Sequence, residues 1–182
     1  MRIVAGAHRG RVLVAPKGHS TRPTADRARQ AMFNVLEHAP WTRPLAGARA
    51  IDLFAGSGAL GLEALSRGAA FCLFVDDDRA GREAITANLA SLRLIDKAKV
   101  LAADATRLPE LADGLFDLAF LDPPYGKGLH ASALESLAPN LSTGALIAVE
   151  RSADEGRLSA AGYRLLDERR WGAAKVTFLA KA

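Results

Sequence analysis

The sequence predicts an α/β fold built on a mostly parallel sheet. From residue 49 onward, apolar segments of strand length alternate with segments whose apolar residues recur at helical spacing. Such alternation is typical of a parallel sheet covered by helices on both faces. Residues 162–182 contain two strand-like segments without a helix between them, which predicts an antiparallel hairpin at the sheet edge. The other expected strands are 49–55, 71–76, 99–104, 116–122 and 144–150, and the expected helices are 58–69, 78–92 and 129–140.

A small extension precedes the alternating part of the chain. Residues 2–5 and 11–14 have the composition of two short strands around a glycine-containing turn. Pro23 and Thr24 then mark the start of a helix, because proline is favoured in the first helical turn. The sequence therefore predicts a β-hairpin followed by a helix.

The extension is basic, and a proline-punctuated linker at residues 40–47 separates it from the rest. Residues 1–43 hold eight Lys or Arg residues against two acids, whereas the whole chain has a net charge of +4. A basic patch attracts phosphates over about a Debye length, so we expect residues 1–43 to contact RNA. A solvated surface is the alternative. Residues 44–182 are expected to form the main domain.

The bulk composition limits the other possibilities. At 182 residues, with 49% hydrophobic and 24% charged residues, the chain has the length and composition of one globular domain. No apolar stretch reaches the roughly 18 residues of a membrane span, and no signal peptide is evident. One cysteine and four scattered histidines give no metal-ligand spacing. We therefore expect a cytoplasmic protein, without a metal and with no need to be more than a monomer.

A glycine loop lies between the first strand and first helix of the main domain. Gly56, Gly58 and Gly61 form G-x-G-x-x-G, and Asp76 follows Gly56 by 20 residues at the end of the next strand. This spacing is typical of a site that binds a nucleotide ribose and, taken alone, indicates NAD. Asp52, before the loop, would repel a pyrophosphate and favours S-adenosylmethionine, which is cationic and has no phosphate. The alternative is that Asp52 caps the N–H groups of the loop.

Acids end several of the predicted strands. Asp52, Asp76, Asp104 and Asp122 all fall where an apolar strand stops, at the edge where open parallel sheets bind ligands. Asp104 is placed to accept a hydrogen bond from the amine of adenine, with a plain loop acid as the alternative. Which of the three acids at positions 76–78 binds the ribose stays open; the first is favoured because it directly follows the apolar strand.

The tetrad Asp122-Pro123-Pro124-Tyr125 has the composition of a catalytic motif for methyl transfer to an amine. An exocyclic amine of a base is a poor nucleophile, and it improves when both of its N–H groups donate to fixed acceptors. The Asp122 carboxylate and the Pro123 carbonyl supply two acceptors, and the consecutive prolines stiffen the backbone. Tyr125 supplies a face on which a base can stack. A rigid turn after a strand is the alternative.

These residues resemble the class I S-adenosylmethionine-dependent amino-methyltransferases, whose hallmark is [Asp/Asn/Ser]-Pro-Pro-[Tyr/Phe/Trp]. Nearly the whole chain is similar to the bacterial methyltransferases that modify N2 of a guanine in 16S ribosomal RNA. The segments that carry this resemblance are "RIVAGAHRGRVL", "STRPTADRARQAMFNVL", "AIDLFAGSGALGLEALSRGA", "FVDDDRAGREAITANL", "LDPPY" and "RRWGAAKVTFL". The departures are Asp76 and Gln30, where the family usually has Glu, and Trp171, where it often has Tyr.

The resemblance implies a Rossmann-like sheet of seven strands and assigns roles to particular residues. Asp122, Pro123, Pro124 and Tyr125 would hold the target amine in the assembling small ribosomal subunit or its RNA. The implied cofactor-binding residues are Asp52, Phe54, Ala55, Gly56, Gly58, Asp76 and Asp104. The residues expected to contact RNA are Arg9, Arg11, Arg22, Thr24, Arg27 and Arg29.

Other functions remain open at this point. The same tetrad chemistry would serve methylation of adenine N6 or of a glutamine side chain. An NAD-dependent reductase and a non-catalytic RNA-binding module are alternatives of another class. Cytosine-C5 methylation needs a cysteine nucleophile, and Cys72 lies inside a predicted buried strand without a Pro-Cys context.

Overall fold

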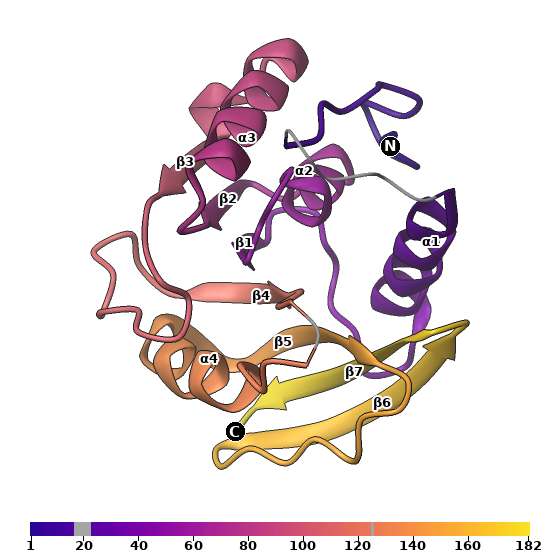
Figure 1. Ribbon diagram of the computed structural model, residues 1–182, viewed down its shortest axis with the longest axis vertical. Coiled ribbons are helices and arrows are strands. Elements are labelled where there is room, and N and C mark those ends of the chain that lie inside the picture. The colour runs from indigo at the N-terminus through magenta and orange to yellow at the C-terminus, as the bar shows by residue number, and fades with distance from the viewer. Residues whose placement is uncertain (17–22, 125) are drawn as a thin grey trace.

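A computed structural model describes residues 1–16, 23–124 and 126–182, with the backbone alone for residues 23–25. The strands are β1 (Arg49–Leu53), β2 (Phe71–Val75), β3 (Ala98–Leu101), β4 (Phe116–Leu121), β5 (Leu141–Ser152), β6 (Tyr163–Trp171) and β7 (Ala174–Lys181). They form one seven-stranded sheet in the order β3-β2-β1-β4-β5-β7-β6 (Figure 1). The first five strands pair in parallel, and β7 is antiparallel to both β5 and β6. The predicted mostly parallel sheet with an antiparallel C-terminal hairpin is confirmed.

In the part of the chain that the structure describes, one α-helix precedes β1, and three α-helices and two short 3-10 helices lie between strands. The helices are α1 (Pro23–His38), α2 (Ala59–Ser66), α3 (Arg79–Leu92), α4 (His130–Leu137), η1 (Ile95–Lys97) and η2 (Ala138–Asn140). Helix α3 begins where the carboxylate of Asp78 accepts hydrogen bonds from the N–H groups of Ala80 and Gly81, and it ends at Arg93 in a left-handed conformation (φ 57°). Among the described residues, no helix is both long and apolar enough to cross a membrane.

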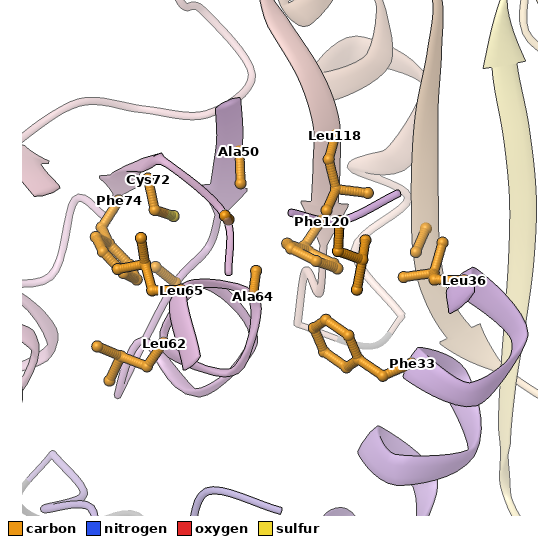
Figure 2. Close-up of a cluster of buried hydrophobic side chains, with 14 of the residues drawn as sticks. Phe33, Leu36, Ala50, Leu62, Ala64, Leu65, Cys72, Phe74, Leu118 and Phe120 are labelled. Atoms are coloured by element: carbon orange, nitrogen blue, oxygen red, sulfur yellow. The ribbon is translucent and has the colours of Figure 1, made fainter. Parts of the chain in front are cut away.

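Each face of the sheet is covered by its own hydrophobic cluster, because side chains alternate between the faces along every strand. One cluster lies under α1, α2 and α3. Figure 2 shows Phe33 of α1 pointing at Phe120 of β4, and the two ring centroids are 5.4 Å apart. The other cluster, which includes Leu134 and Leu121, lies under α4. The sheet is therefore the middle layer of three.

Helix α2 approaches β2 closely enough to require glycine at one position. A Cβ atom added at Gly61 would lie 2.4 Å from Cε1 of Phe74 and 2.6 Å from Sγ of Cys72. The third glycine of G-x-G-x-x-G thus serves helix–strand packing. This close approach brings the start of α2 to the end of β1.

The N-terminal segment differs from its prediction. The two expected strands are reduced to a single antiparallel bridge between Arg2 and Val12. Ile3 and Leu13 are buried in the same cluster as side chains of α2 and α3, so the segment shares a core with the sheet. Backbone hydrogen bonds still join its two arms, and side chains of α2 and α3 dock it on the helices, as described below.

Candidate active site

The acidic strand ends meet where the order of the strands reverses. From β1 the chain builds outward to β2 and β3 on one side and to β4 and β5 on the other. Leu53 is level with Val75 of β2 and with Leu121 of β4. Asp76 and Asp122 therefore follow on either side of the end of β1. Ligands of open α/β sheets bind at such a reversal point.

The glycine loop runs between these two acids. Three of its residues have positive φ angles: Phe54 (58°), Gly56 (55°) and Gly58 (77°). Positive φ is unusual for phenylalanine and occurs where the surroundings impose it, often at functional sites. The N–H of Ala55 donates to the carbonyl of Val75 (3.1 Å), and the N–H of Gly58 donates to the carbonyl of Ala55 (2.7 Å). The loop is thus a tight turn tied to β2.

Asp52 lies beneath the loop and is 1% exposed. Its Oδ2 accepts a hydrogen bond from the N–H of Gly61 in the first turn of α2 (2.9 Å). Burial raises the pKa of the Asp52 carboxyl well above its ordinary value, and the negative charges of Asp122 and Asp76 add to this effect. The capping contact is the alternative that the sequence left open, so cofactor binding by Asp52 stays a prediction.

Asp76 holds the loop from the other side. Its Oδ2 accepts a hydrogen bond from the N–H of Gly56 (2.6 Å), and its Oδ1 accepts one from the N–H of Asp78 (2.8 Å). Asp78 is occupied as the cap of α3, and Asp77 is exposed. Of the three acids that could bind a ribose, Asp76 is the one whose side chain accepts a hydrogen bond from the glycine loop among the described residues.

Asp104 lies beyond its strand instead of ending it, because β3 stops at Leu101. Its Oδ1 accepts hydrogen bonds from the N–H (2.8 Å) and the hydroxyl (2.6 Å) of Thr106, and its Oδ2 accepts one from Nε of Arg107 (3.1 Å). The Thr106 hydroxyl contributes most to lowering the pKa of the Asp104 carboxyl. Asp104 is therefore held as an ionised acceptor.

A small hollow lies among these residues. The lining residues are Phe54, Val75, Asp76, Asp77, Ala103, Asp104 and Ala105. The carboxylates among them can accept hydrogen bonds from hydroxyl and amino groups. The same carboxylates would repel a pyrophosphate. These acidic residues therefore fit S-adenosylmethionine better than NAD.

Asp122 begins the proline turn on the far side of the loop. Asp122 is exposed to solvent, whereas Pro123 is buried. Desolvation by the surrounding chain, followed by repulsion from the Glu150 carboxylate of β5, raises the pKa of Asp122 to about 8. Water at this exposed residue weakens both causes and leaves their direction unchanged. The sequence did not single out Glu150, because only the pairing of β4 with β5 brings it beside Asp122.

We expect the substitution Asp122→Asn to stabilise the protein increasingly as the pH rises. The folded-state pKa is raised to about 8, whereas an unfolded Asp titrates near about 4. Between these values the folded state binds more protons, so the contribution of Asp122 to stability falls with rising pH. The melting temperature of the variant relative to wild type should therefore increase from pH 5 to pH 8. Asp96→Asn, at an exposed acid before β3, is the control, and a constant difference for Asp122→Asn would contradict the burial argument.

The residues predicted to contact RNA differ in their exposure to solvent. Arg9, Arg11 and Arg27 are exposed. Arg29 is not, since its guanidinium is buried, pairs with Asp26 (2.7 Å) and donates to the backbone carbonyl of Arg2. This position does not suit a direct RNA contact, and we correct that expectation.

Part of the predicted site lies outside the described residues. Arg22 and Tyr125 are in this group, as is the side chain of Thr24. The part of the chain that the structure describes contains no cluster of three or more His, Cys, Asp or Glu side chains arranged to hold a metal ion.

A family model described as Conserved hypothetical protein 95 matches residues 1–180. The chain belongs to this family. Ribosomal RNA small subunit methyltransferase D of Escherichia coli (strain K12) is 38% identical over 159 residues, which cover 86% of this chain and 77% of that protein. The protein of the same name from Haemophilus influenzae is 35% identical over 179 residues, which cover 94% of this chain and 89% of that protein.

Solved structures extend the similarity from sequence to fold. The "Putative methyltransferase yhhF" of Escherichia coli superposes with a TM-score of 0.83 and 34% identity, covering 100% of this chain and 97% of that one. This member of the Conserved hypothetical protein 95 family therefore has the class I methyltransferase fold. The resemblance to bacterial ribosomal RNA methyltransferases, drawn from the sequence, is confirmed at the level of the family.

Proposed function

We propose that this protein transfers a methyl group from S-adenosylmethionine to the N2 amine of a guanine in 16S ribosomal RNA. The observation that carries the proposal is the meeting of Asp76 and Asp122 on either side of the glycine loop, at the point where the strand order reverses. Asp76 lines a small hollow beside the loop, and Asp122 begins the proline turn. Relatives named Ribosomal RNA small subunit methyltransferase D support ribosomal RNA as the substrate.

Several residues would hold the cofactor. Asp76 and Asp104, which line the hollow, would accept hydrogen bonds from the ribose and the adenine amine. The backbone of Phe54 to Gly58 and the carboxylate of Asp52 would surround the methionine end. Bound S-adenosylmethionine supplies an electrophilic methyl group on a sulfonium.

The proline turn would prepare the target amine. Asp122 would accept one N–H of the amine, and the carbonyl of Pro123 would accept the other, so that the nitrogen lone pair is free to attack the methyl group as its bond to sulfur breaks. Positive charge develops on the nitrogen during attack, so these acceptors stabilise the transition state more than the ground state. Asp122 can then take the proton, and its raised pKa suits that task. Tyr125 would stack on a base that is unpaired or flipped out of the RNA.

Identification of the methylated nucleoside tests the proposal. The protein is incubated with methyl-labelled S-adenosylmethionine and small-subunit particles from cells that lack the enzyme, and the digested RNA is analysed by mass spectrometry. N2-methylguanosine is expected. Label in N6-methyladenosine would keep the chemistry and overturn the target, and label in a glutamine of a protein would overturn the RNA substrate. Absence of label with NAD binding by calorimetry would overturn the reaction class.

We expect RNA binding to depend on salt and on the exposed arginines of the N-terminal part. Arg27→Glu should weaken RNA binding and reduce the slope of log K against log salt by about 1 or more, because fewer counterions are released. Affinity for S-adenosylmethionine without RNA should stay unchanged. Lys97→Glu, an equal charge change at the exposed η1, is the control. Equal effects of both variants would show that only net charge matters and would contradict the assignment of RNA binding to the N-terminal arginines.

A further inference from the structure

The N-terminal segment is attached to the helices that flank the glycine loop by side chains that bond to its backbone. Glu63 of α2 accepts hydrogen bonds from the N–H groups of Val4 (2.8 Å) and Ala5 (3.0 Å). Ser66 Oγ, one turn further along α2, accepts one from the N–H of His8 (3.0 Å). These contacts dock the first half of the segment on α2.

Asn88 of α3 docks the second half and also reaches the glycine loop. Its Oδ1 accepts a hydrogen bond from the N–H of Val14 (2.7 Å), and its Nδ2 donates to the carbonyl of Val14 (2.9 Å). The same Nδ2 donates to the carbonyl of Ser57 (3.0 Å), which lies between Gly56 and Gly58. Asn88 is 1% exposed, and its bond to Ser57 is buried, whereas its two bonds to Val14 are partly buried. One buried amide therefore joins the loop to the N-terminal segment.

We infer that Asn88 is a positioning residue that couples the glycine loop to the N-terminal segment, so that cofactor and RNA strengthen each other's binding. This inference rests on the proposed function, which places the cofactor on the loop and RNA on the arginines of the extension. Arg11, three residues before Val14, donates to the carbonyl of Ser91 on the same helix as Asn88 (3.0 Å). The exposed basic residue and the buried amide thus hold the same stretch of chain on α3.

The coupling between the glycine loop and the N-terminal segment follows from the limited number of hydrogen bonds that the Asn88 amide can make. Nδ2 has two N–H groups, and both are used, one on each side of the junction. If the carbonyl of Ser57 moves, the amide must leave either the loop or Val14, and a buried donor without a partner is costly. A ligand that fixes the loop therefore also fixes Val14. A second ligand that binds the segment then loses less conformational entropy on binding. Thermodynamic linkage requires each ligand to raise the affinity for the other by the same factor.

The test measures RNA affinity with and without a saturating, unreactive cofactor product. S-adenosylhomocysteine and 16S ribosomal RNA transcribed in vitro are the probes, and the ratio of the two dissociation constants is the coupling factor. For the wild-type protein we expect a factor of about 5 or more. For Asn88→Ala we expect a coupling factor of about 1, because the side chain that joins Ser57 to Val14 is absent. If that variant does not fold, Asn88→Asp keeps the acceptor for Val14 but loses both donors, and it carries the same expectation.

Asn140 provides a matched control. It is also 1% exposed, and it makes the same pattern of one accepted and two donated bonds, with Leu111 N–H (2.8 Å) and the carbonyls of Pro109 (3.1 Å) and Ser136 (3.4 Å). It follows α4, on the opposite face of the sheet, so Asn140→Ala should lose stability and keep the wild-type coupling factor.

The outcomes separate the inference from the proposed function. A wild-type factor near 1, with both ligands bound, would overturn the inference alone. A wild-type factor retained in Asn88→Ala, or lost equally in Asn140→Ala, would also overturn it. A wild-type protein that binds neither S-adenosylhomocysteine nor RNA would overturn the proposed function and the inference with it.

Discussion

Asp122→Ala should lower the rate of methyl transfer by about 10²–10³-fold, the usual loss when a group that stabilises developing charge is removed. The substitution deletes one of the two acceptors proposed for the target amine and the group placed to take its proton. Cofactor affinity should change far less, because the glycine loop is held by Asp76 and Asp52. Single-turnover rates and calorimetric titration with S-adenosylhomocysteine separate the two effects.

The pH profile of kcat/KM tests the ionisation state in which Asp122 acts. Asp122 must be ionised to accept an N–H and later a proton, and its pKa in the free enzyme is raised to about 8. The profile should therefore rise with pH up to that region. Asp96→Ala, at the opposite edge of the sheet, is the control. A rate for Asp122→Ala within a few-fold of wild type would remove Asp122 from the mechanism.

Glu63→Ala should be the most destabilising of the substitutions considered. Glu63 is fully buried and accepts hydrogen bonds from Val4, Ala5 and Nε of Arg67 (2.8 Å), and its Oε2 lies 3.7 Å from Nε of Arg29. Removing the Glu63 carboxylate leaves the buried guanidinium groups of Arg29 and Arg67 with less negative charge to balance them. It also leaves two backbone N–H groups without their acceptor. Breaking a buried ion pair from one side costs about 3–5 kcal/mol. For a chain of this length, this corresponds to a fall in melting temperature on the order of 10 °C.

The exposed pair of Glu83 with Arg79 provides the comparison. The two side chains lie 2.8 Å apart on α3 and both are largely in solvent. Glu83→Ala should cost no more than about 1 kcal/mol. Thermal and urea unfolding of the two variants measure the contrast. Similar losses for both would mean that Glu63 does not hold the N-terminal segment, α1 and α2 together.

The sequence predicted the sheet well because continuous apolar strands and amphipathic helices produce strong periodic signals. The strand-end acids were located for the same reason, since Asp76 and Asp122 directly follow such runs. Asp104 was misplaced relative to its strand, because the small residues Ala102 and Ala103 are compatible with either a strand or a loop. Periodicity thus locates an element more reliably than its last residue.

Side chains whose environment depends on distant partners could not be predicted in this way. Arg29 looked like a surface cation, and its burial depends on Glu63 of another helix. Asn88 looked like an ordinary helix residue, and its importance appears only when Val14 and Ser57 are brought to it. Glu150 lies beside Asp122 because parallel pairing of β4 and β5 places it there. Tertiary contacts, and not local patterns, decide the roles of these residues.

The strand order also constrains how the chain can be made. β7 lies between β5 and β6 in the sheet, yet it follows both of them in the sequence. During synthesis on a ribosome, β6 therefore has no sheet partner until residues 174–181 have emerged. The edge of β5 stays unpaired for the same period, and an unpaired edge is open to wrong association. The sheet can therefore close only when residues 174–181 are free to pair with both neighbouring strands.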